Sequence, residues 1–230
     1  MRGLTCFWIL AMFQHLEATL RKHVIVVKEG KYEEMSVRDA FHIVDDVTFG
    51  AAAEKALTAS PDEQTKFRRK DSPEGSAPCS FLRLKEGVFA LSRECVGSGQ
   101  FGYVKLALRL DQPDETLYAI KVQAIQSATA EDDKQKIICE KIELQVKQEY
   151  QVTRAVGVGL SSFFKRASVG KGPEDKYYTI APYGGVTLRQ WLLFARPDDK
   201  KRLEVAICVV QCVHDLHKKG YAHGDIKLDN

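Results

Sequence analysis

The sequence lacks several features that would assign it quickly to a class of protein. The 34 Lys and Arg residues nearly balance the 31 Asp and Glu residues, and a net charge of +3 is too small to indicate a nucleic-acid-binding surface. The six cysteines include no C-x-x-C pair and no set with histidine at zinc-ligand spacing, so they predict neither a metal site nor a redox compartment. With 44% hydrophobic and 28% charged residues, the composition is that of a globular protein.

The N-terminus lacks the length of apolar sequence that a membrane-spanning helix needs. Its apolar run, Leu4 to Phe13, follows the basic residue Arg2 and precedes the small residue Ala18. This pattern favours a signal peptide within residues 1–22, which would send the protein into the secretory pathway. An amphipathic or buried N-terminal helix is the alternative and would leave the protein cytoplasmic. A wrongly assigned start of the reading frame would also produce such a run.

The sequence does contain a change of pattern near Cys79. Residues 23–78 combine the β-like run HVIVV with a helix predicted over residues 36–47, and they end in a polar stretch with Ser-Pro pairs and the basic run Lys66 to Lys70. We interpret residues 23–78 as an N-terminal extension and linker. Residues 79–230 are predicted to form a separate domain.

Strands come first in this second domain and helices last. The pattern predicts strands over residues 88–99, 103–110 and 116–123, a helix over 132–156, a strand over 176–183 and a helix over 203–219. On the last helix, Cys208 and Cys212 are four residues apart within an apolar pattern, so both are expected to be buried thiols. Gly220 follows at the position of a C-cap. The order of elements predicts an α+β fold.

The first motif with chemical content is GSGQFGYV, which contains Gly97, Gly99, Gly102 and Val104. Glycines let backbone N–H groups approach phosphate oxygens without interference from a Cβ atom. A plain hairpin turn or a dinucleotide fingerprint would give a similar pattern. Because this motif joins two predicted strands rather than a strand and a helix, it argues against the dinucleotide-binding fold.

The second motif is YAIK. Lys121 is the polar member of an apolar strand and is predicted to share a face with Ala119. It either points to solvent at a sheet edge or faces an anion, because a buried ammonium needs a partner. On the long predicted helix, Glu149 falls within the apolar stripe, whereas Glu140 and Glu143 point away. We therefore predict that Glu149 meets Lys121, although an exposed helix end would explain the same pattern.

The third motif is HGDIKLDN, at the end of the chain. A carboxylate such as Asp225 can accept a proton, a lysine such as Lys227 can contact a phosphate, and the amide oxygen of Asn230 can bind a magnesium ion. These three side chains follow the last predicted helix and its glycine. An acid, a lysine and an asparagine so close together look like part of an active site.

The three motifs, in this order, resemble the protein kinase family over about residues 85–230. The resemblance implies a protein-kinase-like fold, in which a β-rich N-lobe carries one long helix and is followed by a hinge and the start of a helical C-lobe. It implies ATP and Mg²⁺ as cofactors. It also implies phosphoryl transfer to serine or threonine residues of proteins, because Lys227 stands where tyrosine kinases have another pattern.

The resemblance also implies a role for each motif residue. Asp225 would be the catalytic base, Lys227 would contact the γ-phosphate, and Asn230 would bind the second magnesium ion. Lys121 would hold the α- and β-phosphates and pair with Glu149. The residues implied in ATP binding are Gly97, Ser98, Gly99, Gln100, Phe101, Gly102, Val104, Ala119, Lys121, Glu149, Ala181, Tyr183 and Gly184.

The hinge and the catalytic loop depart from the family pattern. The segment IAPYGG resembles a hinge in which Ala181 is a small gatekeeper and Tyr183 and Gly184 contact the adenine through backbone groups, but Pro182 replaces the usual acidic residue. Gly224 replaces the arginine that usually contacts a phosphorylated activation loop. The sequence also stops before the metal-binding D-F-G motif. We therefore expect the front part of a kinase, truncated at its catalytic loop and inactive by itself.

Other functions fit the same motifs. A pseudokinase that acts as a scaffold or allosteric partner is one alternative, and a small-molecule phosphotransferase, which also uses H-G-D, is another. The H-G-D motif and the divergent hinge, together with a signal peptide, are also similar to secreted rhoptry-type kinases. The sequence predicts ATP as a partner, no nucleic acid and no transmembrane span, and it does not identify a protein substrate.

Overall fold

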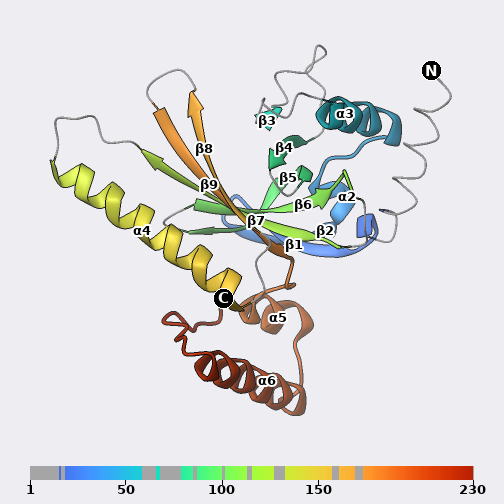
Figure 1. Ribbon diagram of the computed structural model, residues 1–230. Helices are drawn as coiled ribbons and strands as arrows, with labels where there is room; N and C mark the ends of the chain where they lie inside the picture. Colours follow the sequence, from blue (N-terminus) through green and yellow to red (C-terminus); the bar gives the residue numbers. More distant parts are fainter. Residues whose placement is uncertain are drawn as a thin grey trace.

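The computed structural model is a mixed α+β protein built on one large sheet (Figure 1). It describes residues 16, 19–58, 66–67, 79–84, 87–99, 102–112, 116–126, 133–156, 161–168 and 173–229. The strands are β1 His23–Lys28, β2 Lys31–Ser36, β3 Lys66–Phe67, β4 Ser80–Leu84, β5 Gly87–Gly99, β6 Gly102–Arg109, β7 Tyr118–Gln126, β8 Ser161–Ser168 and β9 Pro173–Pro182. The helices are α2 Val37–Ala40, α3 Asp46–Thr58, α4 Asp133–Val156, α5 Leu188–Ala195 and α6 Asp199–Lys218. The predicted α+β class is confirmed.

The sheet runs in the order β2-β1-β5-β6-β7-β9-β8, and all the described strand pairs are antiparallel. β4 pairs with β5 beside this path, and β3 pairs with β4. The register between β5 and β6 shifts twice, between Leu91 and Cys95 and between Cys95 and Gly97. Such irregularities bend a strand. β5 can therefore pair with β4 near its start and with β1 near its end.

The N-terminal segment belongs to this sheet. β1 and β2 form a hairpin whose turn residues, Glu29 and Gly30, both have positive φ, 50° and 76°, as a two-residue turn of type I′ requires. The pairing of Val27 with Cys95 joins the hairpin to β5. The segments before and after Cys79 thus share one sheet, and the domain boundary near Cys79 stays a prediction.

The helix predicted over residues 36–47 is interrupted, so that prediction was wrong. Ser36 caps α2 by accepting a backbone hydrogen bond from its first turn, but α2 has only four residues. His42 then adopts a φ of 54°, which no continuous right-handed helix allows. α3 begins after Asp45, whose carboxylate accepts a hydrogen bond from the backbone N–H of Thr48 at 2.7 Å.

Two hydrophobic clusters pack against the sheet. Along β6 the side chains alternate between them: Leu106 and Leu108 belong to the first cluster and Ala107 to the second. The N-terminal segment supplies much of the first cluster, including Phe41 and Phe49, which are both fully buried. Residues from both sides of Cys79 therefore share this core.

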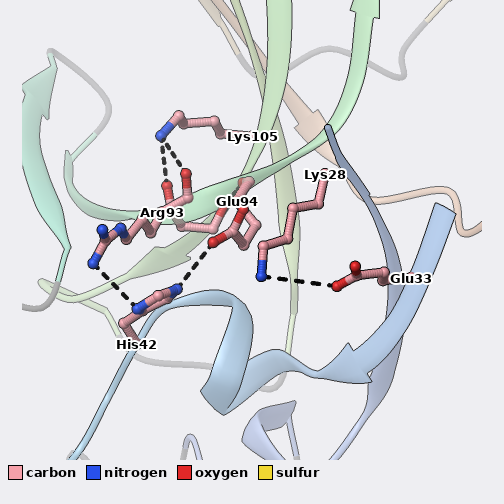
Figure 2. Close-up of polar contacts among 7 residues, drawn as sticks. Lys28, Glu33, His42, Arg93, Glu94 and Lys105 are labelled. Atoms are coloured by element: carbon pink, nitrogen blue, oxygen red, sulfur yellow. Dashed lines mark hydrogen bonds and ion pairs between the residues drawn. The ribbon is translucent and has the colours of Figure 1, made fainter. Parts of the chain in front are cut away.

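Polar contacts also join the N-terminal segment to β5 (Figure 2). The Nε2 atom of His42 lies 3.0 Å from Oε1 of Glu94, and its Nδ1 atom lies 3.3 Å from the guanidinium of Arg93. From β6, Lys105 donates hydrogen bonds to the backbone oxygens of Ser92 and Arg93, each at 2.9 Å. Burial lowers the pKa of Lys105. These contacts fix β5 shortly before its glycine-rich end.

α5 and α6 lie together below the sheet in the view of Figure 1. α6 begins four residues before the predicted start, because Asp198 caps it by accepting a hydrogen bond from the backbone of Lys201 at 2.8 Å. Its apolar stripe lines an open groove of about 490 Å³. The exposed large side chains of this stripe are Leu203, Ile207 and Val210. Cys208 and Cys212 are exposed as well, so the prediction of buried thiols was wrong.

The predicted signal peptide lies outside the described residues, apart from a few positions near its end. Leu16 and Leu20 are helical and buried in the first hydrophobic cluster, at 0% and 4% exposure. The apolar run Leu4 to Phe13 is not among the described residues. Within the described ranges, no helix combines the length and apolarity that crossing a membrane requires.

Candidate functional site

The glycine-rich motif lies at the tip of the β5–β6 hairpin, so it connects two strands as the sequence predicts. The strand register pairs Gly97 with Val104, Ser98 with Tyr103 and Gly99 with Gly102. Gln100 and Phe101, which come between Gly99 and Gly102 in the sequence, lie outside the described residues. A turn between two strands differs from the strand-to-helix turn of a dinucleotide-binding fold.

Gly97 and Gly102 meet different surroundings. A Cβ atom on Gly102 would lie 2.0 Å from the carbonyl oxygen of Val122 on β7, and the φ of Gly102 is 149°. The sheet itself therefore requires glycine at this position. A Cβ atom on Gly97 would lie 3.8 Å from the Cβ of Val104, which is an ordinary contact. The described packing therefore does not require glycine at position 97.

The strand register places five of the predicted ATP-binding residues on one face of the sheet. Directly paired residues of antiparallel strands point to the same side. Gly97 pairs with Val104, and Val104 pairs with Lys121. Two positions before Lys121, Ala119 pairs with Ala181 of β9, so both alanines lie on this face beside the lysine. The predicted shared face of Ala119 and Lys121 is confirmed.

This face is partly open where the candidate residues lie. Gly97, Val104, Ala119, Lys121 and Ala181 are all half-buried. The neighbouring residues that point to the other face belong to the second hydrophobic cluster: Ile120, Val122 and Ile180 are at most 2% exposed. The candidate residues are thus accessible from one side and supported by a packed core on the other.

α4 contacts β7 and β8, and Figure 1 shows it running alongside the sheet. Val146 is buried at 2% exposure, Glu140 is exposed, and Glu143 forms an ion pair along the helix surface. Glu149 lies three residues after Val146, which places both positions on one face of the helix. Glu143 lies three residues before Val146, so this spacing alone does not distinguish the two glutamates, and the predicted helix register stays a prediction. The side chain of Glu149 lies outside the described part, so its pairing with Lys121 stays a prediction.

The segment after β9 has an accessible backbone. Tyr183 donates its backbone N–H to the carbonyl oxygen of Leu117 at 2.7 Å. Since backbone groups alternate between the two edges of a strand, the carbonyl of Pro182 faces the other edge. A Cβ atom on Gly184 would meet nothing within 4 Å. The side chain of Tyr183 packs against the first hydrophobic cluster, and this burial raises the pKa of its hydroxyl.

The loop after α6 carries the predicted catalytic residues. Gly220 ends the helix with a φ of 80°, in agreement with the predicted C-cap. Gly224 also has a positive φ, 73°, so its backbone makes a left-handed turn immediately before Asp225. The backbone N–H of Asp225 donates to Nδ1 of His223 at 3.2 Å, and its Oδ2 lies 2.8 Å from Nζ of Lys227. This ion pair is exposed to solvent.

Two residues that were not predicted from the sequence, Arg189 and Asp229, hold this loop. Arg189, near the start of α5, donates its backbone N–H to the carbonyl oxygen of Leu228 at 2.8 Å. Its Nε and Nη2 atoms contact Oδ1 and Oδ2 of Asp229 at 2.5 and 3.1 Å. The hydrogen bond from Arg189 lowers the pKa of Asp229 below its usual value. No sequence signal pairs these residues, because they lie 40 positions apart.

The described site residues form two groups, one on the sheet and the segment after β9 and one on the loop after α6. Asn230, the predicted magnesium ligand, lies outside the described residues. In the part of the chain that the structure describes, no group of three His, Cys, Asp or Glu side chains is placed to hold a metal ion.

No family model and no curated protein matches the chain. Among solved structures, the chain is similar to the ROP18 kinase domain in complex with AMP-PNP and sucrose, at 16% sequence identity and a TM-score of 0.39. The match covers 65% of this chain and 50% of that one, so the chain spans about half the length of the structure that it matches.

Proposed function

We propose that this chain binds ATP and supplies the nucleotide site and catalytic loop for phosphoryl transfer to serine or threonine residues of proteins, with Mg²⁺ as the metal cofactor. One observation carries the proposal: the strand register puts Lys121 on one half-buried face with the start of the glycine turn and with Ala119 and Ala181. ATP needs these features together, namely backbone donors and a cation for its phosphates and an uncrowded surface for its base.

Each part of this surface has a role in the proposed nucleotide site. Backbone N–H groups of Gly97 to Gly102 contact the phosphates, with Ser98, Gln100 and Phe101 forming the tip of the turn. Lys121 contacts the α- and β-phosphates, and Glu149 neutralises it. The alanines leave room for the adenine beside Val104. The backbone of the segment from Pro182 to Gly184 contacts the edge of the base.

The loop after α6 supplies the proposed chemistry. As the oxygen of the substrate hydroxyl attacks the γ-phosphorus, the bond from that phosphorus to the β–γ bridging oxygen breaks and ADP leaves, while the carboxylate of Asp225 accepts the hydroxyl proton. Lys227 exchanges its contact with Asp225 for one with the γ-phosphate. The amide oxygen of Asn230 is an oxygen donor of the type that Mg²⁺ prefers and would help to hold the ion. When bound, Mg²⁺ neutralises the charge that develops on the phosphate oxygens.

Binding of ATP to residues 1–230 tests the proposal. Lys121→Met removes the cation but keeps an unbranched stem, so we expect the affinity for Mg·ATP to fall at least about tenfold, or ~1.4 kcal/mol. The measurement is isothermal titration calorimetry, with melting temperatures as a check of folding. Lys201→Met is the control, because it removes an exposed, ion-paired lysine on α6.

The outcomes distinguish loss of a nucleotide contact at Lys121 from unfolding and from the general loss of a positive charge. An unchanged affinity in Lys201→Met, together with the loss in Lys121→Met at an unchanged melting temperature, supports a site on this face of the sheet. Failure of the unsubstituted chain to bind ATP at millimolar concentration contradicts the proposal, as does equal binding by both variants.

A further inference from the structure

Arg189 lies in a helical turn that is fixed independently of the loop after α6. Thr187 caps α5 by accepting a hydrogen bond from the backbone of Gln190 at 3.3 Å, and the side chain of Gln190 accepts one from the backbone of Thr187 at 2.9 Å. Gln190 is only 3% exposed, so water has little access to this cap. The start of α5 therefore provides a firm base for the Arg189 side chain.

The loop that Arg189 contacts lies on the surface. Every residue from Ala222 to Asp229 is exposed. The contacts of Asp225 with His223 and Lys227 described above lie within the loop and move with it. Figure 1 shows the chain after α6 turning back to end beside α5, where the bonds from Arg189 reach it.

The geometry of the Arg189 contacts restricts orientation as well as distance. A guanidinium that binds both oxygens of a carboxylate defines a plane, which a single lysine contact does not. The backbone bond to Leu228 adds a third point of attachment on the adjacent residue. Three attachments on two consecutive residues fix the course of the chain at Leu228 and Asp229. These residues lie between Lys227 and Asn230.

We propose that Arg189 is a positioning residue, which holds Leu228 and Asp229 against α5 and thereby sets the placement of Asp225, Lys227 and Asn230. The inference rests on the proposed function, because it gives those three residues their task. Arg189 itself contacts neither nucleotide nor substrate in this proposal. Its effect passes through the loop.

The rate of proteolysis after Lys227 measures how firmly the loop is attached to α5, and it requires no nucleotide. Cleavage within an ordered segment requires local opening. We expect endoproteinase Lys-C to cut after Lys227 about tenfold faster in Arg189→Leu than in the unsubstituted chain. Asp229→Asn should also be cut after Lys227 faster than the unsubstituted chain. Arg202→Leu is the control, because it removes an exposed Arg–Asp pair on α6. The protease should cut this variant after Lys227 at the same rate as the unsubstituted chain.

Nucleotide titrations measure the functional consequence. We expect Mg²⁺ to increase the ATP affinity of the unsubstituted chain, and we expect Arg189→Leu to lose this increase while it retains the affinity measured in EDTA. A general loss of structure would lower both affinities and the melting temperature. Arg189→Lys, which keeps the charge but not the two-point contact, should recover only part of the increase.

The two measurements fail in different ways. Unchanged cleavage after Lys227 in both Arg189→Leu and Asp229→Asn overturns the inference, whether or not the chain binds ATP. Unchanged enhancement by Mg²⁺ in Arg189→Leu overturns it as well. A chain that binds no ATP at all overturns the proposed function and the functional role of Arg189 with it, even if cleavage is accelerated.

Discussion

A methyl group added to Gly102 would collide with the carbonyl oxygen of Val122, whereas one added to Gly97 would make an ordinary contact with Val104. The reason for glycine therefore differs between these two positions of the hairpin. At Gly102 the constraint is the close approach of β6 to β7. At Gly97 the described packing sets no such limit, and in the proposed function the approach of the ATP phosphates favours glycine there.

Alanine substitutions separate these two constraints. We expect Gly102→Ala to lower the free energy of unfolding by roughly 1–3 kcal/mol, because backbone atoms must move to admit the methyl group. Gly97→Ala should change it by less than about 0.5 kcal/mol but weaken ATP binding, since the methyl group stands where the phosphates approach. Urea denaturation and ATP titration of both variants check the prediction. Full ATP affinity in Gly97→Ala would contradict it.

The start of α3 shows how one side chain sets the boundary of an element. Asp45 accepts a hydrogen bond from the backbone N–H of Thr48, and this bond lowers the pKa of Asp45 below its usual 3.8. A carboxyl group whose pKa is depressed by folding contributes stability above the pKa of the unfolded chain. It loses that contribution as the pH falls through its lower, folded value.

The substitution Asp45→Asn keeps a capping oxygen but removes the charge. We expect the variant to melt at a lower temperature than the unsubstituted protein at neutral pH, and we expect the difference to shrink as the pH falls below 3.8. Thermal melting followed by circular dichroism from pH 7 to acid checks this. A difference that stays constant over the whole range would show that the charge of Asp45 plays no part.

Elements with a regular pattern could be predicted from the sequence, and those that depend on a single dihedral or a distant partner could not. The alternation in β7 predicted the shared face of Ala119 and Lys121, which fixes half of the candidate site. The helix predicted through His42 failed because apolar spacing does not show a positive φ. The contact of Arg189 with Asp229 joins two turns far apart in the sequence, and no local pattern encodes it.

At the scale of the whole molecule, segments from both sides of Cys79 are stabilised by one hydrophobic core. Phe49 of α3 is fully buried, and its ring centre lies 6.0 Å from that of Phe81 on β4, beyond Cys79. The N-terminal segment and the strands that carry the candidate site therefore stabilise each other. We infer that they unfold as one cooperative unit.

Removal of the Phe49 ring tests whether the two segments unfold cooperatively. We expect Phe49→Ala to reduce the free energy of unfolding by about 3–5 kcal/mol and to lower hydrogen-exchange protection in β6 and β7 as much as in β1. Denaturation monitored by exchange and mass spectrometry resolves the two regions. If the strands near Lys121 kept their protection while β1 lost it, the segments would be independent units.

The β1–β2 hairpin has a further consequence for how copies of the protein behave together. β2 is the terminal strand of the sheet, and its exposed residues include Lys31, Glu33 and Glu34. Charged side chains on an outer strand discourage a second chain from adding its own strand there. On the inner side of β2, β1 pairs with β5 at Cys95. This pairing covers backbone groups of β5 to which another strand could otherwise add. The hairpin thus makes this one edge of the sheet a poor site for the addition of a strand from a second copy of the chain.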